Sequence, residues 1–186
     1  MKRVAFAVLL SSCVLAAPRA AKAAGEDEWQ LSARLGGANK NGSPTASWGL
    51  AGALDLEYGL NDAWSLRVSA GTLSHPVPAV KDVSPAGSLR ATSGVAGATY
   101  TFDVLRLVPY VEGGVGLVYW SGTGIQDHAA LALELGIGAD YLLTPHWAIG
   151  GSAQYLFAPA ELLSNVMQFG EAPLAFSVTA RFSRIF

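Results

Sequence analysis

The stretch WGLAGALDLEYGL, from Trp48 to Leu60, alternates between two kinds of side chain along its whole length. Apart from Gly52, the even positions are large and apolar or aromatic, whereas the odd positions are Gly, Ala, Asp55 and Glu57. A period of two is typical of a β-strand whose two faces meet different surroundings. We therefore expect a strand with one face in an oily medium and the other against small and charged groups.

The same alternation recurs along the chain and predicts an all-β protein. We expect eight strands, each long enough to cross a bilayer at the usual ~9–11 residues. The fourth segment has an alternation too weak to show which of its faces points outward. The expected strands are residues 29–37, 48–60, 64–71, 89–102, 110–119, 131–141, 147–157 and 174–186.

The connections between these strands alternate between short turns and long loops. Short turns at one end and long loops at the other are typical of outer-membrane barrels, whose short turns face the periplasm. The alternative, a soluble β-sandwich, would expose a polar face rich in charge. Here that face is mostly Gly, Ala and Ser, which fits a narrow lumen. We predict an eight-stranded antiparallel transmembrane up-and-down β-barrel with short periplasmic turns and longer extracellular loops. The short connections are 61–62, 103–108 and 144–146, and the long ones are 38–47, 73–88, 121–129 and 158–172.

Aromatic residues fall into two groups when strand direction is counted from the first strand. The span from Trp48 to Tyr58 corresponds to roughly 25 Å of height after tilt, which matches the apolar band of such barrels. We expect membrane-interface aromatics near the short turns (Trp29, Tyr58, Trp64, Tyr141, Trp147) and near the long loops (Trp48, Tyr119, Tyr155).

The first 23 residues are expected to be a signal peptide. A basic start precedes an apolar run over residues 4–17, and Ala21-Lys22-Ala23 supplies the small-x-small pattern read by signal peptidase. The alternative is a lipobox at Leu10-Ser11-Ser12-Cys13 with Cys13 lipidated, but the apolar run continues past that cysteine. The predicted mature chain, residues 24–186, is one outer-membrane β-barrel domain.

Composition excludes several classes of protein. The chain is 51% hydrophobic and 14% charged, yet no apolar run beyond the leader approaches the ~20 residues of a transmembrane helix. Loss of the leader leaves eight of the 12 basic side chains against all 14 acidic ones, a formal charge of −6 that disfavours nucleic-acid binding. One cysteine and three scattered histidines give neither a disulfide scaffold nor a zinc cluster. We expect no cofactor and no metal.

The polar face carries eight charged side chains, which could form a salt-bridge network that fills the lumen or an ion path. A three-residue turn at 61–63 sets Leu60 opposite Trp64, and therefore Glu57 opposite Arg67. Opposite charges across a ladder stabilise each other, and eight strands leave no open channel. We therefore expect a lumen charge network of Arg34, Asp55, Glu57, Arg67, Glu112, Glu134, Asp140 and Arg181.

A catalytic site is not evident in the sequence. Some eight-stranded barrels are lipid A deacylases or acyltransferases, and a serine deacylase needs a base beside its nucleophile. His75, His128 and His146 are the candidate bases, and none has a serine two positions later in the motif of the deacylases. We expect no enzyme activity.

Residues 29–186 resemble the small eight-stranded outer-membrane barrels related to OmpA and OmpX. The resemblance rests on YGLND before WSL at 58–66, VPYV before GGVG at 108–116, GIGADY at 136–141, and the terminal Phe186. It implies an outer-membrane location and identifies Phe186 as the signal read by the barrel-insertion machinery. Arg184 departs from this signal, because an apolar residue is usual there.

We expect a non-enzymatic outer-membrane barrel with a salt-bridged, largely plugged lumen that serves envelope integrity or surface contact. One alternative is a narrow transport barrel for small or hydrophobic solutes, and a further one is a lipid A-modifying barrel enzyme. The expected partners are outer-membrane lipid, lipopolysaccharide and, during biogenesis, the barrel-insertion machinery. We expect a monomer.

Overall fold

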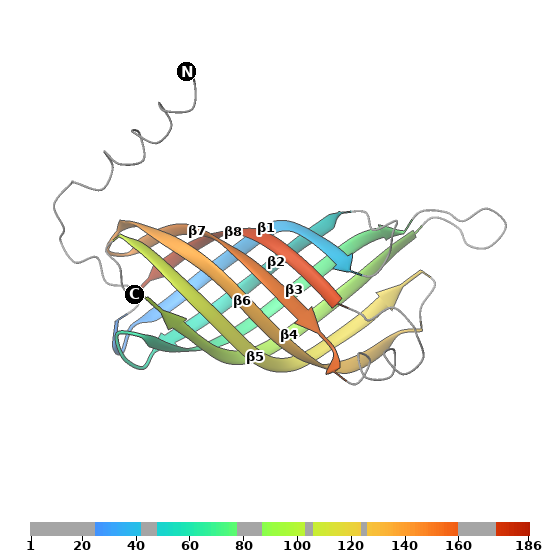
Figure 1. Cartoon of the computed structure of the whole chain (residues 1–186), viewed down its shortest axis with the longest axis horizontal. Coiled ribbons are helices and arrows are strands. Elements are labelled where there is room, and N and C mark those ends of the chain that lie inside the picture. Colours follow the sequence, from blue (N-terminus) through green and yellow to red (C-terminus); the bar gives the residue numbers. More distant parts are fainter. Residues whose placement is uncertain (1–24, 42–47, 78–86, 103–105, 124–125, 160–173) are drawn as a thin grey trace, which may run out of the picture.

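The computed structural model describes residues 25–41, 48–77, 87–102, 106–123, 126–159 and 174–186. Eight antiparallel strands close into a barrel in the order in which they follow one another along the chain (Figure 1). This confirms the predicted fold class. The strands are β1 (Trp29–Asn41), β2 (Gly49–Gly59), β3 (Trp64–Val77), β4 (Gly87–Thr101), β5 (Leu107–Gly122), β6 (His128–Thr144), β7 (Trp147–Phe157) and β8 (Leu174–Ile185).

The barrel is closed by pairing between its first and last strands. The β1–β8 register runs from Gln30 opposite Ile185 to Asn41 opposite Leu174. The end of the barrel that holds the β2–β3, β4–β5 and β6–β7 connections and Phe186 is called the short-turn end, and it lies on the left of Figure 1. The opposite end, which holds the connections after β1, β3, β5 and β7, is called the loop end.

The turn between β2 and β3 forms as predicted. The backbone N–H of Leu60 donates to the carbonyl of Trp64 at 2.8 Å, and the side chain of Asn61 accepts from the N–H groups of Ala63 and Trp64. This turn sets the predicted register, in which Glu57 and Arg67 are directly opposite.

Several strands continue into segments that the sequence assigns to loops. β1 ends at Asn41 rather than at residue 37, and β3 and β5 continue to Val77 and Gly122. The reason is that each added residue has a partner in the ladder of at least one neighbouring strand, as with Pro76 opposite Ser88 and Asn41 opposite Leu174. Glycine, proline and serine in these stretches predict loops, but the strands continue as long as an adjacent strand offers a residue to pair with.

The outer wall of the barrel is apolar, as the alternation predicts. Leu35, Leu50 and Ile137 are 70%, 72% and 62% exposed, and large apolar side chains from every strand except β4 share this outward direction. A soluble protein would not leave so many large apolar groups uncovered, because exposed apolar patches of this extent mark contact with another apolar phase.

The described residues contain no helix long and apolar enough to cross a membrane. The predicted signal peptide and the lipobox alternative lie outside the described residues, and both stay predictions.

Candidate functional site

The interior of the barrel holds the predicted lumen charge network. Its eight members come from six strands, and the two-residue period turns all of them inward. Each side chain is almost inaccessible to solvent, with residue exposures from 2% to 7%. The members are Arg34 on β1, Asp55 and Glu57 on β2, Arg67 on β3, Glu112 on β5, Glu134 and Asp140 on β6, and Arg181 on β8.

Two arginines and three carboxylates form the first ionic cluster. Arg34 Nη2 donates to Asp55 Oδ1 at 2.6 Å, and Arg34 Nη1 lies 3.4 Å from Glu112 Oε1. Arg67 Nη1 lies 3.4 Å from both Asp55 Oδ1 and Glu112 Oε2, while Arg67 Nη2 donates to Glu134. Asp55 and Glu112 therefore bridge two like charges that would otherwise repel each other in a narrow, weakly screened space.

Neutral side chains add hydrogen bonds to this cluster. Ser69 Oγ accepts from Arg34 Nη2 at 3.0 Å, and Gln154 Nε2 donates to Glu112. Buried charges are tolerated when opposite charges and hydrogen bonds replace the lost water. Ser69 and Gln154 supply two of these hydrogen bonds, and neither was among the predicted network residues.

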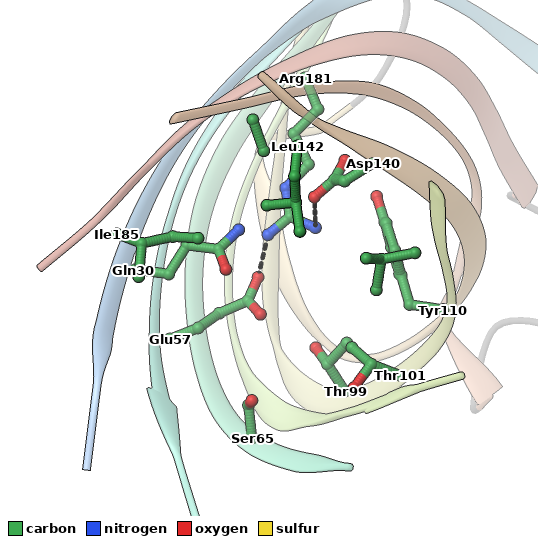
Figure 2. A pocket seen from close by; sticks show the side chains of 12 residues that line it. Gln30, Glu57, Ser65, Thr99, Thr101, Tyr110, Asp140, Leu142, Arg181 and Ile185 are labelled. Carbon is green, nitrogen blue, oxygen red and sulfur yellow. Dashed lines mark hydrogen bonds and ion pairs between the residues drawn. The ribbon is translucent and has the colours of Figure 1, made fainter. Parts of the chain in front are cut away.

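Arg181 organises a second ionic cluster nearer the short-turn end. It donates to Glu57 and to Ser32 Oγ, the latter at 2.9 Å, and its Nη1 lies 3.3 Å from Asp140 Oδ2. Figure 2 shows the guanidinium between these two carboxylates, with Tyr110 beside them. The Arg181 Cζ atom lies 4.9 Å from the centre of the Tyr110 ring, which is cation–π distance.

The ion pairs differ from the expected pairing of Glu57 with Arg67. These residues are opposite in register, but Glu57 forms its ion pair with Arg181, and Arg67 forms its ion pairs with carboxylates of the first cluster. The physical reason is the narrow lumen, across which long side chains from non-adjacent strands meet. Arg181 on β8 reaches β2, and Arg67 on β3 reaches Glu134 on β6.

Apolar side chains lie in the lumen on both sides of the charge network. The cluster toward the loop end is built mainly by β4 and β5, and it includes Trp120 and Val118. A smaller cluster at the short-turn end contains Val108, Leu142, Ala148 and Ile185. Neither cluster was predicted from the sequence, although Val118 and Trp120 are an even number of residues from Glu112 on β5 and therefore face inward with it. The loop-end cluster consists of Leu89, Ala91, Val95, Val118, Trp120, Ala132, Leu156 and Ala175.

Two small cavities lie where the ionic and apolar groups meet. The cavity beside Arg181 and the short-turn cluster measures about 20 Å³, and the one beside Arg34 and the loop-end cluster about 30 Å³. A water molecule needs roughly 10–15 Å³, so each cavity has room for only one or a few waters. The Thr99 hydroxyl borders the first cavity and has no hydrogen-bond partner among the described residues, which suits a water there.

The predicted interface aromatics lie on the outer wall near the two rims. Trp29 and Tyr58 pack at 4.9 Å between ring centres, and Trp147 stacks on Phe182 at 5.0 Å, all at the short-turn end. Contact with membrane interfaces stays a prediction for the whole set, as does the role of Phe186 in insertion. The set is Trp29, Trp48, Tyr58, Trp64, Tyr119, Tyr141, Trp147 and Tyr155.

The three histidines do not form a shared site in the described residues. His75 is buried on β3 and His128 begins β6, both toward the loop end, whereas His146 is exposed in the β6–β7 turn at the other end. Within the described ranges, no group of three or more His, Cys, Asp or Glu side chains has the arrangement of a metal site.

The sequence matches the family described as "Outer membrane protein beta-barrel domain" over residues 6–172. A comparison with curated proteins finds no significant match. Among solved structures, Neisserial surface protein A is 18% identical with a TM-score of 0.62, covering 85% of this chain and 97% of that one. The N-terminal barrel of OprF from Pseudomonas aeruginosa is 17% identical (TM-score 0.55, 87% and 99% covered), and Ail, the attachment invasion locus protein of Yersinia pestis, is 15% identical (0.54, 87% and 99%). At these identities the likeness shows a shared fold.

Proposed function

Because the chain belongs to the outer membrane protein β-barrel domain family, we propose that it is a non-enzymatic outer-membrane barrel whose lumen is closed. Its work is then done at the outer wall and at the two ends of the barrel, by supporting the envelope or by making surface contacts. The family gives the outer membrane as its location.

The layered interior is the observation that carries this proposal. Along the barrel axis, an apolar cluster, the Arg181 cluster, the cluster of Arg34 and Arg67, and a second apolar cluster follow one another. An ion that crosses the lumen would have to pass the two apolar clusters and break the buried ion pairs between them. Both steps are costly, because unpaired charge in an apolar environment is strongly disfavoured.

A conductance recording tests the closed lumen directly. The protein, purified from the outer membrane and inserted into planar bilayers, is expected to give no reproducible unit conductance in 1 M KCl, whereas a porin of known conductance does so in the same bilayers. A stable unit conductance, or swelling of proteoliposomes in small sugars, would instead identify a narrow transport barrel.

A second measurement tests the absence of enzyme activity. Incubation of the protein with lipid A and a phospholipid acyl donor in mixed micelles is expected to release no fatty acid and to transfer no acyl chain, as followed by mass spectrometry. Release that depends on one of the three histidines would overturn the proposal.

The role in the envelope is tested in the cell. Support of the envelope predicts that deleting the gene increases sensitivity to detergent and that the wild-type protein restores resistance. Unchanged detergent resistance would contradict a role in envelope support and favour a role in surface contact.

A further inference from the structure

Arg184 interrupts the apolar outer face of β8. The residues of the same face toward the loop end are Phe182, Ala180 and Val178, and Phe186 follows at the short-turn end. Arg184 is exposed, whereas its neighbours Ser183 and Ile185 are buried in the lumen. The guanidinium therefore lies on the membrane side of the wall, where the barrel-insertion pattern has an apolar residue.

Two aromatic rings hold the Arg184 side chain at the rim. The Arg184 Cζ atom lies 4.8 Å from the centre of the Phe186 ring and 5.2 Å from that of Trp147, which is opposite Arg184 in the β7–β8 register. Trp147 is itself fixed by stacking on Phe182. Both distances are within cation–π range, so the charged group has a preferred position before any ligand binds.

Arg184 has no acidic partner among the described residues. Each inward arginine of the charge network has at least two carboxylates within 4 Å, but the side chain of Arg184 forms no ion pair or hydrogen bond in the described part of the chain. Two acids before β1 are already bonded, since Asp27 accepts from Tyr58 at 2.6 Å and Glu28 accepts from the N–H of Gly25 at 2.6 Å. The N–H donors of the Arg184 guanidinium therefore remain available to a group outside the protein.

The family sets the surroundings of this rim. In outer-membrane barrels the short turns face the periplasm, and the aromatic rim lies at the level of the lipid headgroups. The lipids of that leaflet are glycerophospholipids, whose phosphates lie at the same depth. A guanidinium matches a phosphate in charge and in its two parallel N–H donors, and aromatic stacking leaves those edge donors free.

We propose that Arg184, positioned by Trp147 and Phe186, binds the phosphate of one glycerophospholipid in the periplasmic leaflet, with the acyl chains against the apolar wall. The site is on the outer surface and does not depend on whether the lumen is closed.

Native mass spectrometry of the protein in a neutral detergent tests this site. With dimyristoylphosphatidylglycerol we expect one saturable bound lipid, and with dimyristoylglycerol, which lacks the phosphate, binding about tenfold weaker or more. Inorganic phosphate at the same concentration is expected to compete poorly, because it lacks acyl chains. Equal binding of the two lipids would overturn the proposal, and full competition by inorganic phosphate would reduce the site to an anion site.

Variants locate the binding on the barrel. Arg184→Gln is expected to lower the affinity for the phosphatidylglycerol about tenfold, and Arg184→Lys to lower it less because the charge remains. The matched control is Arg90→Gln, which removes another exposed, outward-facing arginine at the loop end and is expected to leave binding unchanged. Retained binding in Arg184→Gln, or equal loss in Arg90→Gln, would contradict the assignment. If Arg184→Gln does not fold, the lipid comparison on the wild-type protein still decides.

Discussion

Arg181 is the residue on which the short-turn half of the charge network depends. It contacts carboxylates of two strands and the ring of Tyr110, and all of these groups are buried. A buried charge that loses its partner keeps its desolvation cost without compensation. The coupling free energy between Arg181 and Glu57 is therefore a direct measure of how much the buried ion pairs contribute to stability.

Glu57→Gln and Arg181→Met are each expected to lower the free energy of unfolding by about 3–5 kcal/mol. The double variant is expected to lose clearly less unfolding free energy than the sum of the two single losses. In each single variant one buried charge loses its partner, whereas in the double variant both charges of the pair are absent. Urea unfolding in lipid vesicles, followed by tryptophan fluorescence, measures all three values.

The matched control is a second cycle with Glu57→Gln and Arg67→Met. These residues are opposite in register but form their ion pairs elsewhere, so a smaller coupling is expected than for Glu57 with Arg181. A larger coupling in the Glu57–Arg67 cycle would mean that the ladder, and not the contact across the lumen, sets the pairing.

The lumen is so narrow at Gly138 that the Tyr110 ring occupies the space a side chain would need. A Cβ added at Gly138 would lie 2.4 Å from Cζ and Oη of Tyr110, whose ring also packs on Arg181. Gly138→Ala is therefore expected to cost about 1–3 kcal/mol of unfolding free energy through overpacking. Gly94→Ala, where an added Cβ meets nothing within 4 Å, is the control and is expected to stay within about 0.5 kcal/mol of the wild type. Equal effects of the two changes would mean that both Tyr110 and the backbone carbonyl of Gly151, 2.6 Å from the added Cβ, can move away freely.

At the scale of a single strand, β2 presents one face to the charge network and the other to the membrane. Leu54 is 61% exposed and lies midway between Trp48 and Tyr58, whereas Leu60 is 46% exposed just past the end of β2. Leu54→Arg is expected to cost about 2–4 kcal/mol near the bilayer midplane, and Leu60→Arg about 0–1 kcal/mol near the interface. Unfolding titrations of both variants in vesicles give the comparison, and equal costs would argue against this depth assignment.

The strands whose faces contrast could be predicted from the sequence, and the one without contrast could not. β2 sets leucines against Asp55 and Glu57, so its facing and its register with β3 follow from the turn at 61–63. β4 places Leu89 and Val95 inside, in the loop-end apolar cluster, while Thr92 and Ala96 face outward. An apolar layer inside the lumen cancels the contrast on which the assignment of faces depends.

The charged members of the network could also be predicted, but their partners could not. Alternation places a side chain on the inner or outer face, and the register gives its neighbours within the sheet. Neither gives the contacts across the lumen, such as Arg181 with Glu57 or Arg67 with Glu134, which depend on how strand tilt and barrel closure bring distant strands together.

At the scale of the whole molecule, the two ends of the barrel have different chemistry. The short-turn end carries the outward-facing Arg184 beside the rings of Trp147 and Phe186, and the loop end carries the larger interior apolar cluster. The orientation of the barrel in the membrane therefore decides which leaflet Arg184 meets and which end faces the outside of the cell.

Cysteine labelling in intact cells tests this orientation, and the chain is well suited to it because Cys13, its one cysteine, lies in the predicted leader. His146→Cys at the short-turn end and Ser88→Cys at the loop end replace exposed side chains, and the hydrogen bonds of residues 88 and 146 described in the structure use the backbone. With short turns in the periplasm, a membrane-impermeant maleimide is expected to label Ser88→Cys in intact cells and His146→Cys only after the outer membrane is permeabilised. The reverse pattern would invert the barrel and move Arg184 to the outer leaflet, where lipopolysaccharide replaces the glycerophospholipid of the proposed site.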